Sequence, residues 1–479
     1  MKKKLFLSIV FGFFIVFINA QNDIDAFRFS QNNWEGTARF MGAGGAFGAV
    51  GADFSALSTN PASIGVFKKN EISFTPIVIS VFNSKANYFN SESKYISSNY
   101  SITNLGMVFK TNAIPNSKWN AIQFGVGYNR INDFNNSSLV EGTSIGSSMT
   151  DEFVNSANST NFQNLYGDNL VAWETWLIDT LPGDDNHYYS PFSGSNLAQS
   201  KYTKTSGGID EMAFSVGGNY DDRIFIGATM GIPFIHYKEI SSYEEIDEEM
   251  TVGGMDSYTI DDELIVKGSG INLKLGILYQ PFKFMRIGAA FHTPTYYNAI
   301  SDNFYREITS TSDAGKEYSA SYENQYNYKL TTPLRAIGSL AFFINKRAFI
   351  SAEYEFVDYG MAYMYANDYS FADENKNIQE KYGISNIVRV GTEVYLSENF
   401  LIRLGYNFKS SPYKNEINTG TSHLGSLGFG IRTKSFFFDL AYIFKYSIEN
   451  YWLYNPELVE ASNNTYINHK VFATVGIRF

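Results

Sequence analysis

The strongest constraint on the fold is a two-residue alternation of apolar and polar side chains that recurs toward the C-terminus. In segment 436–446, one face carries only aromatic and aliphatic side chains, whereas Asp439 and Lys445 lie on the other face. Such alternation is typical of a β-strand with one apolar and one hydrated face. A soluble β-sandwich gives the same pattern, so the alternation alone does not identify the class. Three further segments alternate in this way: 350–356, 388–396 and 400–409.

The connections between the strands distinguish between these classes. We predict about fourteen strands, at 71–83, 98–110, 119–131, 209–219, 222–239, 263–279, 284–299, 328–344, 347–357, 385–396, 400–409, 422–432, 435–446 and 467–479. Tight turns join them at 219–222, 280–283, 345–346, 397–399 and 433–434. Long polar stretches alternate with these turns, at 132–208 (the longest), 240–262, 300–327, 358–384 and 447–466. Short turns at one end, long loops at the other and an even strand number predict an all-β, transmembrane antiparallel barrel over 71–479.

The last strand ends on an aromatic residue. Val471, Ala473, Val475, Ile477 and Phe479 share one face of this strand. A terminal aromatic residue in an alternating strand resembles the sorting signal of bacterial outer-membrane barrels. We therefore expect Phe479 to be recognised by the barrel-assembly machinery of a Gram-negative bacterium, and the barrel to be surrounded by outer-membrane lipid and lipopolysaccharide.

The first twenty residues are predicted to be a signal peptide. Three lysines, at positions 2–4, precede an apolar stretch over 5–18, and the small residue Ala20 offers a cleavage site. The apolar stretch is too short for a comfortable transmembrane helix. We therefore expect an exported mature chain that begins at Gln21.

Composition excludes several classes of protein. The 479 residues contain no cysteine, which excludes disulfides, a Cys-ligated metal site and a Cys nucleophile. The formal net charge of -11 does not suit a nucleic-acid partner, which needs a basic face. The five histidines are scattered, and no catalytic arrangement or metal-binding spacing is visible. We expect no enzyme activity, no cofactor and no metal site.

Residues 21–70 do not alternate. Segment 36–51 is rich in glycine, but its spacing misses the dinucleotide-binding pattern and no Gly-Lys-Ser/Thr follows. We interpret 21–70 as a compact segment that plugs the barrel, with a short helix over 55–58. Glycines on the inward faces of the expected strands would allow its close approach, although the small-to-large alternation of a barrel wall explains them nearly as well. These are Gly125, Gly127, Gly217, Gly227, Gly276, Gly288, Gly391 and Gly405.

The plug carries a specific resemblance. The run G-T-A-R-F-M-G-A-G-G-A-F-G-A at 36–49, followed by D-F-S-A-L-S-T-N-P-A-S-I-G-V at 53–66, resembles the N-terminal hatch of the FadL/TodX family of outer-membrane transporters. Asn60, Pro61 and Ala62 match the hatch motif of that family, and Phe54 and Leu57 lie within the same run. The chain is similar to the branch whose members are sometimes labelled haemin receptors.

The resemblance implies a function. A hydrophobic small molecule, such as a long-chain fatty acid or an aromatic hydrocarbon, would pass through the barrel by passive, hatch-gated diffusion and leave sideways into the membrane. Three alternatives remain open at this stage: a haem receptor, with His236 and His292 as iron ligands, an adhesin or structural barrel, and an open porin.

Candidate substrate contacts follow from the inward faces and the longest loop. Arg389 or Arg403 could bind a substrate carboxylate, but pairing with carboxylates of the wall is the favoured alternative, because buried charges are normally paired. In the longest loop, Leu170 together with Trp173, Trp176 and Leu177 has helical spacing and could form an apolar capture patch, unless the loop packs on itself.

The resemblance also implies a lateral opening in the wall. Gly125 and Gly127, on the third expected strand, are our candidates for the kink that forms it.

Overall fold

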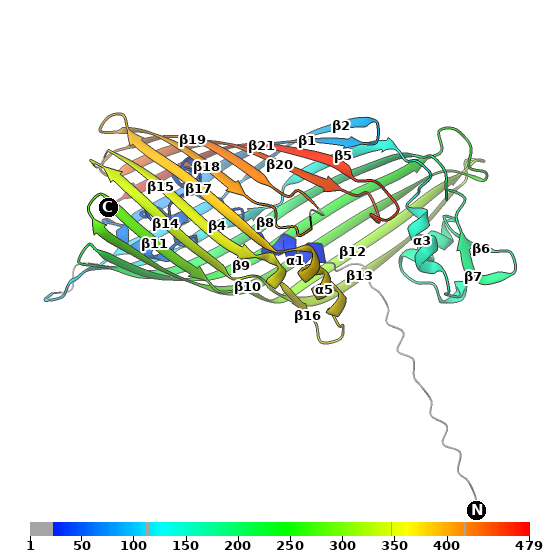
Figure 1. Ribbon diagram of the computed structural model, residues 1–479, viewed down its shortest axis with the longest axis horizontal. Helices are drawn as coiled ribbons and strands as arrows, with labels where there is room; N and C mark the ends of the chain where they lie inside the picture. The colour runs from blue at the N-terminus through cyan, green and yellow to red at the C-terminus, as the bar shows by residue number, and fades with distance from the viewer. Residues whose placement is uncertain (1–22, 112–114, 346, 416–417) are drawn as a thin grey trace, which may run out of the picture.

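The protein is a closed barrel of fourteen antiparallel strands, as predicted (Figure 1). The computed structural model describes residues 23–111, 115–345, 347–415 and 418–479, so the expected signal peptide lies outside the described residues. Strand β21 (Ser462–Arg478) closes the cylinder against β1 (Glu71–Tyr88), in a register that runs from Glu71↔Arg478 to Asn87↔Asn463. Closure leaves no sheet edge between the first and last strands.

Ten of the fourteen barrel strands are single elements and four are interrupted. The single elements are β1, β8 (Ala198–Tyr220), β9 (Ile224–Ile246), β10 (Met255–Phe282), β15 (Ala348–Asp358), β17 (Ile384–Tyr395), β18 (Phe400–Lys409), β19 (Ser422–Arg432), β20 (Phe436–Tyr451) and β21. The interrupted strands are β2 (Ser91–Ser101) with β3 (Asn104–Lys110), β4 (Trp119–Asp133) with β5 (Asn136–Thr143), β11 (Met285–His292) with β12 (Tyr296–Ser312), and β13 (Glu317–Thr331) with β14 (Arg335–Ile344). The short strand β16 (Tyr363–Tyr365) adds to β13.

Several strands extend further than the sequence predicts. The expected loops 240–262 and 300–327 are largely strand, because β9 and β10 pair up to Ile246↔Ser257, and β12 and β13 up to Thr311↔Glu317. The longest connection is 144–197 rather than 132–208, since β5 and the first half of β8 occupy its ends. Beyond the apolar belt the outer faces of these strands are polar, so the lipid-facing apolar residues that identified the strands are missing there.

The outer surface carries a belt of exposed apolar side chains. Ile226, Leu275, Val390, Leu427 and Val475 are each between 36% and 54% exposed, and they come from five different strands. An apolar surface of this extent on soluble proteins is rare, whereas alternation of lipid-facing and lumen-facing residues produces it in a membrane barrel. Among the described residues, no helix is both long and apolar enough to cross a membrane.

The C-terminal residue Phe479 directly follows the last strand of the barrel. The C-terminus lies at the end of the barrel that carries the short turns (Figure 1). Phe479 donates its backbone N–H to Asn70 at 3.1 Å, and its side chain is 59% exposed. Its recognition by assembly machinery stays a prediction.

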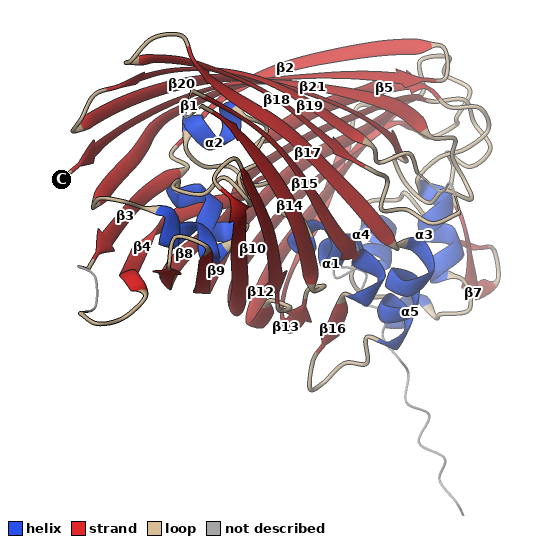
Figure 2. Ribbon diagram, turned by 60° about the vertical axis from the view of Figure 1, so that its left-hand side comes forward, coloured by secondary structure: helices blue, strands red, loops and turns tan. Residues whose placement is uncertain are grey.

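Helices lie inside the barrel and in the long loops. Within residues 23–67 they are α1 (Asp23–Ser30), α2 (Ala38–Gly42) and the 3-10 helices η1 (Phe54–Ser58) and η2 (Pro61–Val66). In the loops they are α3 (Thr150–Ala157), η3 (Phe162–Asn164), α4 (Asp168–Glu174), η4 (Tyr359–Met361) and α5 (Ala372–Lys381), with the hairpin of β6 (Asp179–Leu181) and β7 (Asp184–Tyr189). Figure 2 shows α2 enclosed by the strands and α3, α4 and α5 at the end with the long loops.

Candidate functional site

Residues 23–67, which we call the plug, lie in the lumen, where α1 packs against α5 of a long loop and α2, η1 and η2 lie nearer the short turns. Polar side chains at the helix starts fix its course: Thr37 accepts a hydrogen bond from the N–H of Phe40, Asp53 accepts one from Ser55, and Asn60 accepts one from Ala62. Each is an N-cap, which satisfies a donor that the helix leaves free. Phe54 and Leu57 are no more than 1% exposed, so the plug packs tightly without long helices.

Asn60, Pro61 and Ala62 form a joint inside the plug. Asn60 Nδ2 donates to the carbonyl of Gly48 at 2.8 Å, and its Oδ1 accepts from the N–H of Ala62 at 3.1 Å. Pro61 begins η2, where its missing N–H costs nothing. The triplet therefore holds η2 against the glycine-rich turn.

The inward glycines of the wall mark where the plug lies. A Cβ added to Gly125 would stand 3.1 Å from the side chain of Ile64, and one added to Gly127 would stand 2.5 Å from Phe54. The same holds for all eight glycines expected to face inward, because a Cβ added to any of them would stand 3.1 Å or less from an atom of the plug. They are Gly125, Gly127, Gly217, Gly227, Gly276, Gly288, Gly391 and Gly405. The close approach predicted for them is confirmed.

Buried ion pairs join the plug to the wall. Glu393 Oε2 accepts from Nε of Arg39 at 3.0 Å and from Nε of Arg403 at 2.7 Å, and Arg403 Nη2 also donates to Asp439 at 2.7 Å. Arg432 donates to the second oxygen of Asp439 at 2.9 Å. Because Arg39 belongs to α2 and the other four residues to β17–β20, this chain of charges fixes the plug against four neighbouring strands.

Arg389 is paired in the same manner. Its guanidinium donates to Glu353 and to Glu355, both at 2.6 Å, and Arg335 donates to Glu355 from the other side, also at 2.6 Å. The favoured alternative for Arg389 and Arg403, pairing within the wall, is confirmed by these contacts. Carboxylate binding by either arginine would have to displace a buried partner.

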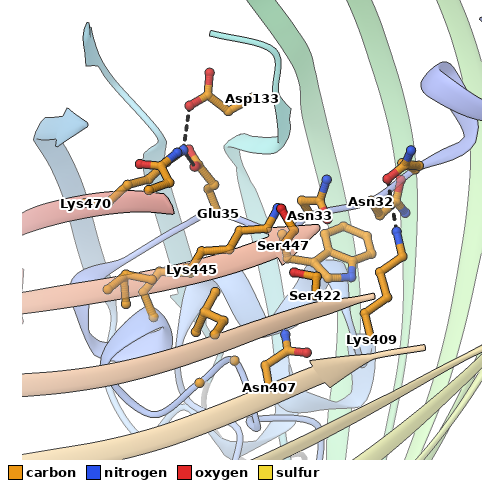
Figure 3. A pocket seen from close by; sticks show the side chains of 18 of the residues that line it. Asn32, Asn33, Glu35, Asp133, Asn407, Lys409, Ser422, Lys445, Ser447 and Lys470 are labelled. Atoms are coloured by element: carbon orange, nitrogen blue, oxygen red, sulfur yellow. Dashed lines mark hydrogen bonds and ion pairs between the residues drawn. The ribbon is translucent and has the colours of Figure 1, made fainter. Parts of the chain in front are cut away.

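A cavity of about 340 Å³ lies above the plug, between Trp34 and the inner faces of β18–β21 (Figure 3). Its lining is mostly polar or charged. Lys470 from β21 lies between Glu35 of the plug and Asp133 at the end of β4, with 2.5 Å to the latter (Figure 3). Burial raises the pKa of Glu35, while Lys470 beside it acts in the opposite direction.

Two further lysines reach the cavity, and neither has a carboxylate partner in the part of the chain that the structure describes. Lys409 Nζ donates to the amide oxygen of Gln31 at 3.0 Å and lies 5.3 Å from the ring centre of Tyr359. Lys445 extends into the cavity toward Asn33 and Ser447 (Figure 3). Sequence analysis missed both as candidate binding residues, although both lie on hydrated faces of strongly alternating strands.

The wall is irregular beside this cavity. No backbone ladder joins β2 to β5 in the part of the chain that the structure describes, and a side-chain bond from Ser93 to the carbonyl of Leu139, at 2.7 Å, bridges them. Where β4 bulges, the N–H groups of Asn33 and Glu35 donate to the carbonyls of Ile131 and Arg130, at 2.9 and 3.1 Å. The plug thus takes the place of a strand here.

Gly125 and Gly127 lie in a regular stretch of the ladder. Their neighbours pair continuously with β8 from Ala121 to Arg130, and the irregularities lie at Trp119/Ala121 and Arg130/Asn132. The interruption of the third barrel strand is at residues 134–135. A role of the two glycines in a lateral opening stays a prediction, whereas their contact with the plug is observed.

The expected capture patch is divided by the fold. The helix ends at Glu174, so Trp176 and Leu177 lie beyond it, and Trp176 has a φ of 61°. Leu177 is fully buried in the loop core, so the loop packs on itself at this position. Trp173 stacks on Phe162 with 5.5 Å between ring centres, while Trp176 is 50% exposed. Of the four predicted residues, Leu170 and Trp173 are half-buried and Trp176 alone is exposed.

The two histidines considered as haem ligands lie on opposite faces of the wall. His292 is buried, and its Nε2 lies 2.8 Å from the carbonyl oxygen of Thr59 in the plug. His236 is exposed on the outer face of β9. They cannot share one iron. The described residues contain no group of three or more acidic or histidine side chains placed to hold a metal ion.

Asp25 in α1 makes the docking of this helix dependent on pH. Burial raises the pKa of Asp25 to about 6, although Arg28, with which it is hydrogen-bonded, lowers it. This value exceeds the ordinary pKa of 3.8, so protonation of Asp25 stabilises the docked helix α1. That stabilisation is complete below about pH 4 and is lost as the pH rises through 6. We therefore expect the backbone amides of residues 23–30 to be better protected from hydrogen exchange at pH 5 than at pH 8, after correction for the intrinsic exchange rate at each pH. In Asp25→Asn the difference should vanish, and an unchanged difference would contradict this assignment.

Comparison with known proteins identifies the fold. No family model matches the sequence, and no curated protein sequence matches it. Among solved structures, a Pseudomonas aeruginosa FadL homologue superposes with a TM-score of 0.56 at 12% identity, covering 93% of this chain and 98% of that one. The P. putida toluene transporter TodX gives 0.53 at 11% identity, covering 92% and 98%. The CymD monoaromatic hydrocarbon channel gives 0.51 at 12%, covering 94% and 99%. The chain therefore has the fold of the FadL and TodX barrels over nearly its whole length.

Proposed function

We propose that this protein is an outer-membrane channel for the uptake of hydrophobic small molecules, of the long-chain fatty acid or aromatic hydrocarbon type. The observation that carries the proposal is the combination of a lumen closed by the plug and a wall whose ladder is interrupted between β2 and β5, beside that plug. A simple porin needs neither feature. Two proteins that share the fold, a toluene transporter and a monoaromatic hydrocarbon channel, support a hydrophobic substrate.

A lateral route is physically favourable because it delivers an apolar molecule directly into the membrane. Apolar molecules gain free energy when they leave water for the hydrocarbon layer. A plug that blocks the straight path and a wall that is not closed by backbone hydrogen bonds favour release into that layer. In this scheme the plug is the hatch, Asn33 and Glu35 are the residues that withdraw from the bulge of β4, and the step needs no energy input beyond the gradient.

The belt of exposed apolar side chains and the arrangement of short turns and long loops support an outer-membrane location, with the long loops outside the cell. Trp176 is the residue that we propose for first contact with an apolar molecule. The haem alternative has less support, since His236 and His292 face opposite sides of the wall. The proposed activity is transport and includes no catalytic step.

The test compares uptake by cells that make the full chain, a variant lacking residues 36–65, or neither. Labelled oleate and toluene are the probes, and the amount of folded barrel in each outer membrane is measured in parallel. We expect the full chain to raise uptake of at least one probe and to exclude small sugars in liposome-swelling assays. The deletion variant should admit sugars. A full chain that admits sugars as readily as the deletion variant would be a porin, and one that changes neither measurement would support the adhesin or structural alternative.

A further inference from the structure

On the inner faces of β18, β19 and β20, the cavity of about 340 Å³ contains a group of polar side chains, most of which have no side-chain hydrogen-bond partner among the described residues. Two rows of inward side chains cross β18, β19 and β20 here. The register aligns Lys409 with Ser422 and Ser422 with Ser447 in one row, and Asn407 with Leu424 and Leu424 with Lys445 in the next. Figure 3 shows Lys409, Lys445, Asn407, Ser422 and Ser447 around the same space. We call these five residues the cationic patch.

Among the residues that the structure describes, neither ammonium group of the patch forms an ion pair, although Glu449 also lines the cavity. Lys409 is only 9% exposed, yet its single hydrogen-bond acceptor is the neutral amide of Gln31. Within the described residues, no carboxylate lies within 4.0 Å of the Nζ of Lys409 or of Lys445. Lys470, in the same cavity, has two carboxylate partners. Because buried charges are normally paired, two unpaired lysines in one cavity indicate a site for an anion.

The neighbours of the lysines are hydrogen-bonding groups rather than apolar ones. The side chains of Asn407, Ser422 and Ser447 have no side-chain hydrogen-bond partner among the residues that the structure covers. Strands lie about 4.8 Å apart and alternate residues about 7 Å apart along a strand, so the patch measures roughly 10 by 7 Å. This area suits a small molecule with several polar groups. A hydrocarbon chain would remove water from these groups without replacing their hydrogen bonds, which is unfavourable.

The patch is accessible from the loops. A second cavity, of about 130 Å³, is lined by Lys409, Lys445 and Ser447 together with Pro412, Tyr413 and Gly420 of the β18–β19 connection. Both cavities therefore share the patch, and the second one opens from it toward the long loops. Phe27, Gln31 and Asn33 of the plug and the acidic residue Glu449 also line this second cavity, so the route to the lysines runs along α1.

We propose that the cationic patch is a binding site for a small organic anion that carries several hydroxyl groups, such as a sugar acid. The carboxylate lies between Lys409 and Lys445, and its hydroxyl groups bond to Asn407, Ser422 and Ser447. This goes beyond the proposed function, in which the transported molecule is hydrophobic. The site and the hydrophobic route can therefore be present or absent independently.

The experiment measures binding to the purified full chain in detergent by calorimetry at low ionic strength. The probes are glucuronate, glucose and decanoate, which separate the charge, the hydroxyl groups and an apolar tail. We expect glucuronate to bind, glucose not to bind measurably, and decanoate to bind more weakly than glucuronate. Lys409→Gln and Lys445→Gln should each weaken glucuronate binding by about tenfold or more, the loss expected for a charge-assisted hydrogen bond. Lys376→Gln, in exposed helix α5, is the matched control and should leave binding unchanged.

A second measurement separates loss of the site from loss of the fold. Without ligand, Lys409→Gln and Lys445→Gln should keep or raise the midpoint of thermal unfolding, since each removes an unpaired, desolvated charge. Lys470→Gln should lower the midpoint, because it leaves Glu35 and Asp133 facing each other without a cation. Glucuronate binding that survives both patch substitutions, the absence of any glucuronate binding, or tighter binding of decanoate would each overturn the proposal. Uptake of oleate and toluene is measured in the same variants. If neither probe is taken up, that result counts against the proposed function and not against the anion site.

Discussion

A disulfide between residues 42 and 441 is expected to abolish uptake of hydrophobic probes and to do so reversibly. Gly42 is at the end of α2 in the plug, and Ala441 faces it from β20. A Cβ built on Gly42 stands 3.5 Å from the Cβ of Ala441, which is at the short end of the range that a disulfide spans. The chain contains no native cysteine, so Gly42→Cys with Ala441→Cys can pair only with each other. Once bonded, the plug is covalently part of the wall and cannot withdraw from the lumen.

The measurement is uptake of labelled oleate and toluene by cells with the double variant, before and after reduction. Oxidised protein should transport at the background level, and reduction should restore the rate of the single variants. The Gly42→Cys single variant is the necessary control, because its added Cβ comes within 3.0 Å of the Gly428 backbone. Uptake that continues at full rate with the disulfide formed would show that the plug does not have to move, and the hatch mechanism would be wrong.

The barrel could be predicted from the sequence because the membrane makes strong and simple demands on it. Every backbone polar group in lipid needs a protein partner, and lipid-facing residues must alternate with lumen-facing ones. Segments such as 400–409 and 436–446 carry that alternation over their full length, and both are observed strands, although β20 continues to Tyr451. The tight turn at 433–434 is equally well placed, since β19 ends at Arg432 and β20 begins at Phe436.

The strand ends and the loops could not be predicted in the same way. Outside the apolar belt, β13 presents Glu323, Gln325 and Asn327 on its exposed face, so it lacks the lipid-facing apolar side chains that identified the other strands, and the tyrosines on its other face were read as part of a polar loop. The same reasoning applies to the capture patch. Helical spacing was present in the sequence, but whether Leu177 faced outward depended on tertiary packing of a loop that has its own core.

The plug was partly predictable and its contacts were not. Inward glycines such as Gly391 and Gly405 were consistent with a close approach to the wall, but the small-to-large alternation of a barrel wall explained them nearly as well. The pairing of Lys470 with Glu35 joins residues 435 positions apart in the chain, and no local pattern encodes it. For the same reason the patch formed by Lys409 and Lys445 emerged only when three strands were placed side by side.

Neutralisation of Glu393 is expected to loosen the plug in the folded barrel. In Glu393→Gln, the side chain keeps its shape but loses the charge that Arg39 and Arg403 share at 3.0 and 2.7 Å. Arg403 retains Asp439, whereas Arg39 has no other carboxylate within 4.0 Å among the described residues. An uncompensated buried charge costs about 3–5 kcal/mol, and because Arg39 belongs to the plug, that cost falls on the plugged state. The barrel can relieve it by exposing Arg39 to water.

The measurement is conductance of the purified protein in planar bilayers, together with protease sensitivity of residues 23–67. A loss of about 3 kcal/mol raises the population of the open state by roughly a hundredfold, so openings that are rare in the natural protein should become frequent. Glu263→Gln is the matched control, because Glu263 forms an exposed pair with Lys238 at 2.9 Å and exposed pairs contribute about 0–1 kcal/mol. Equal behaviour of the two variants would mean that the Arg39–Glu393 pair does not retain the plug. Frequent opening in Glu393→Gln alone, with no opening in the oxidised disulfide variant, would assign both effects to movement of the same segment.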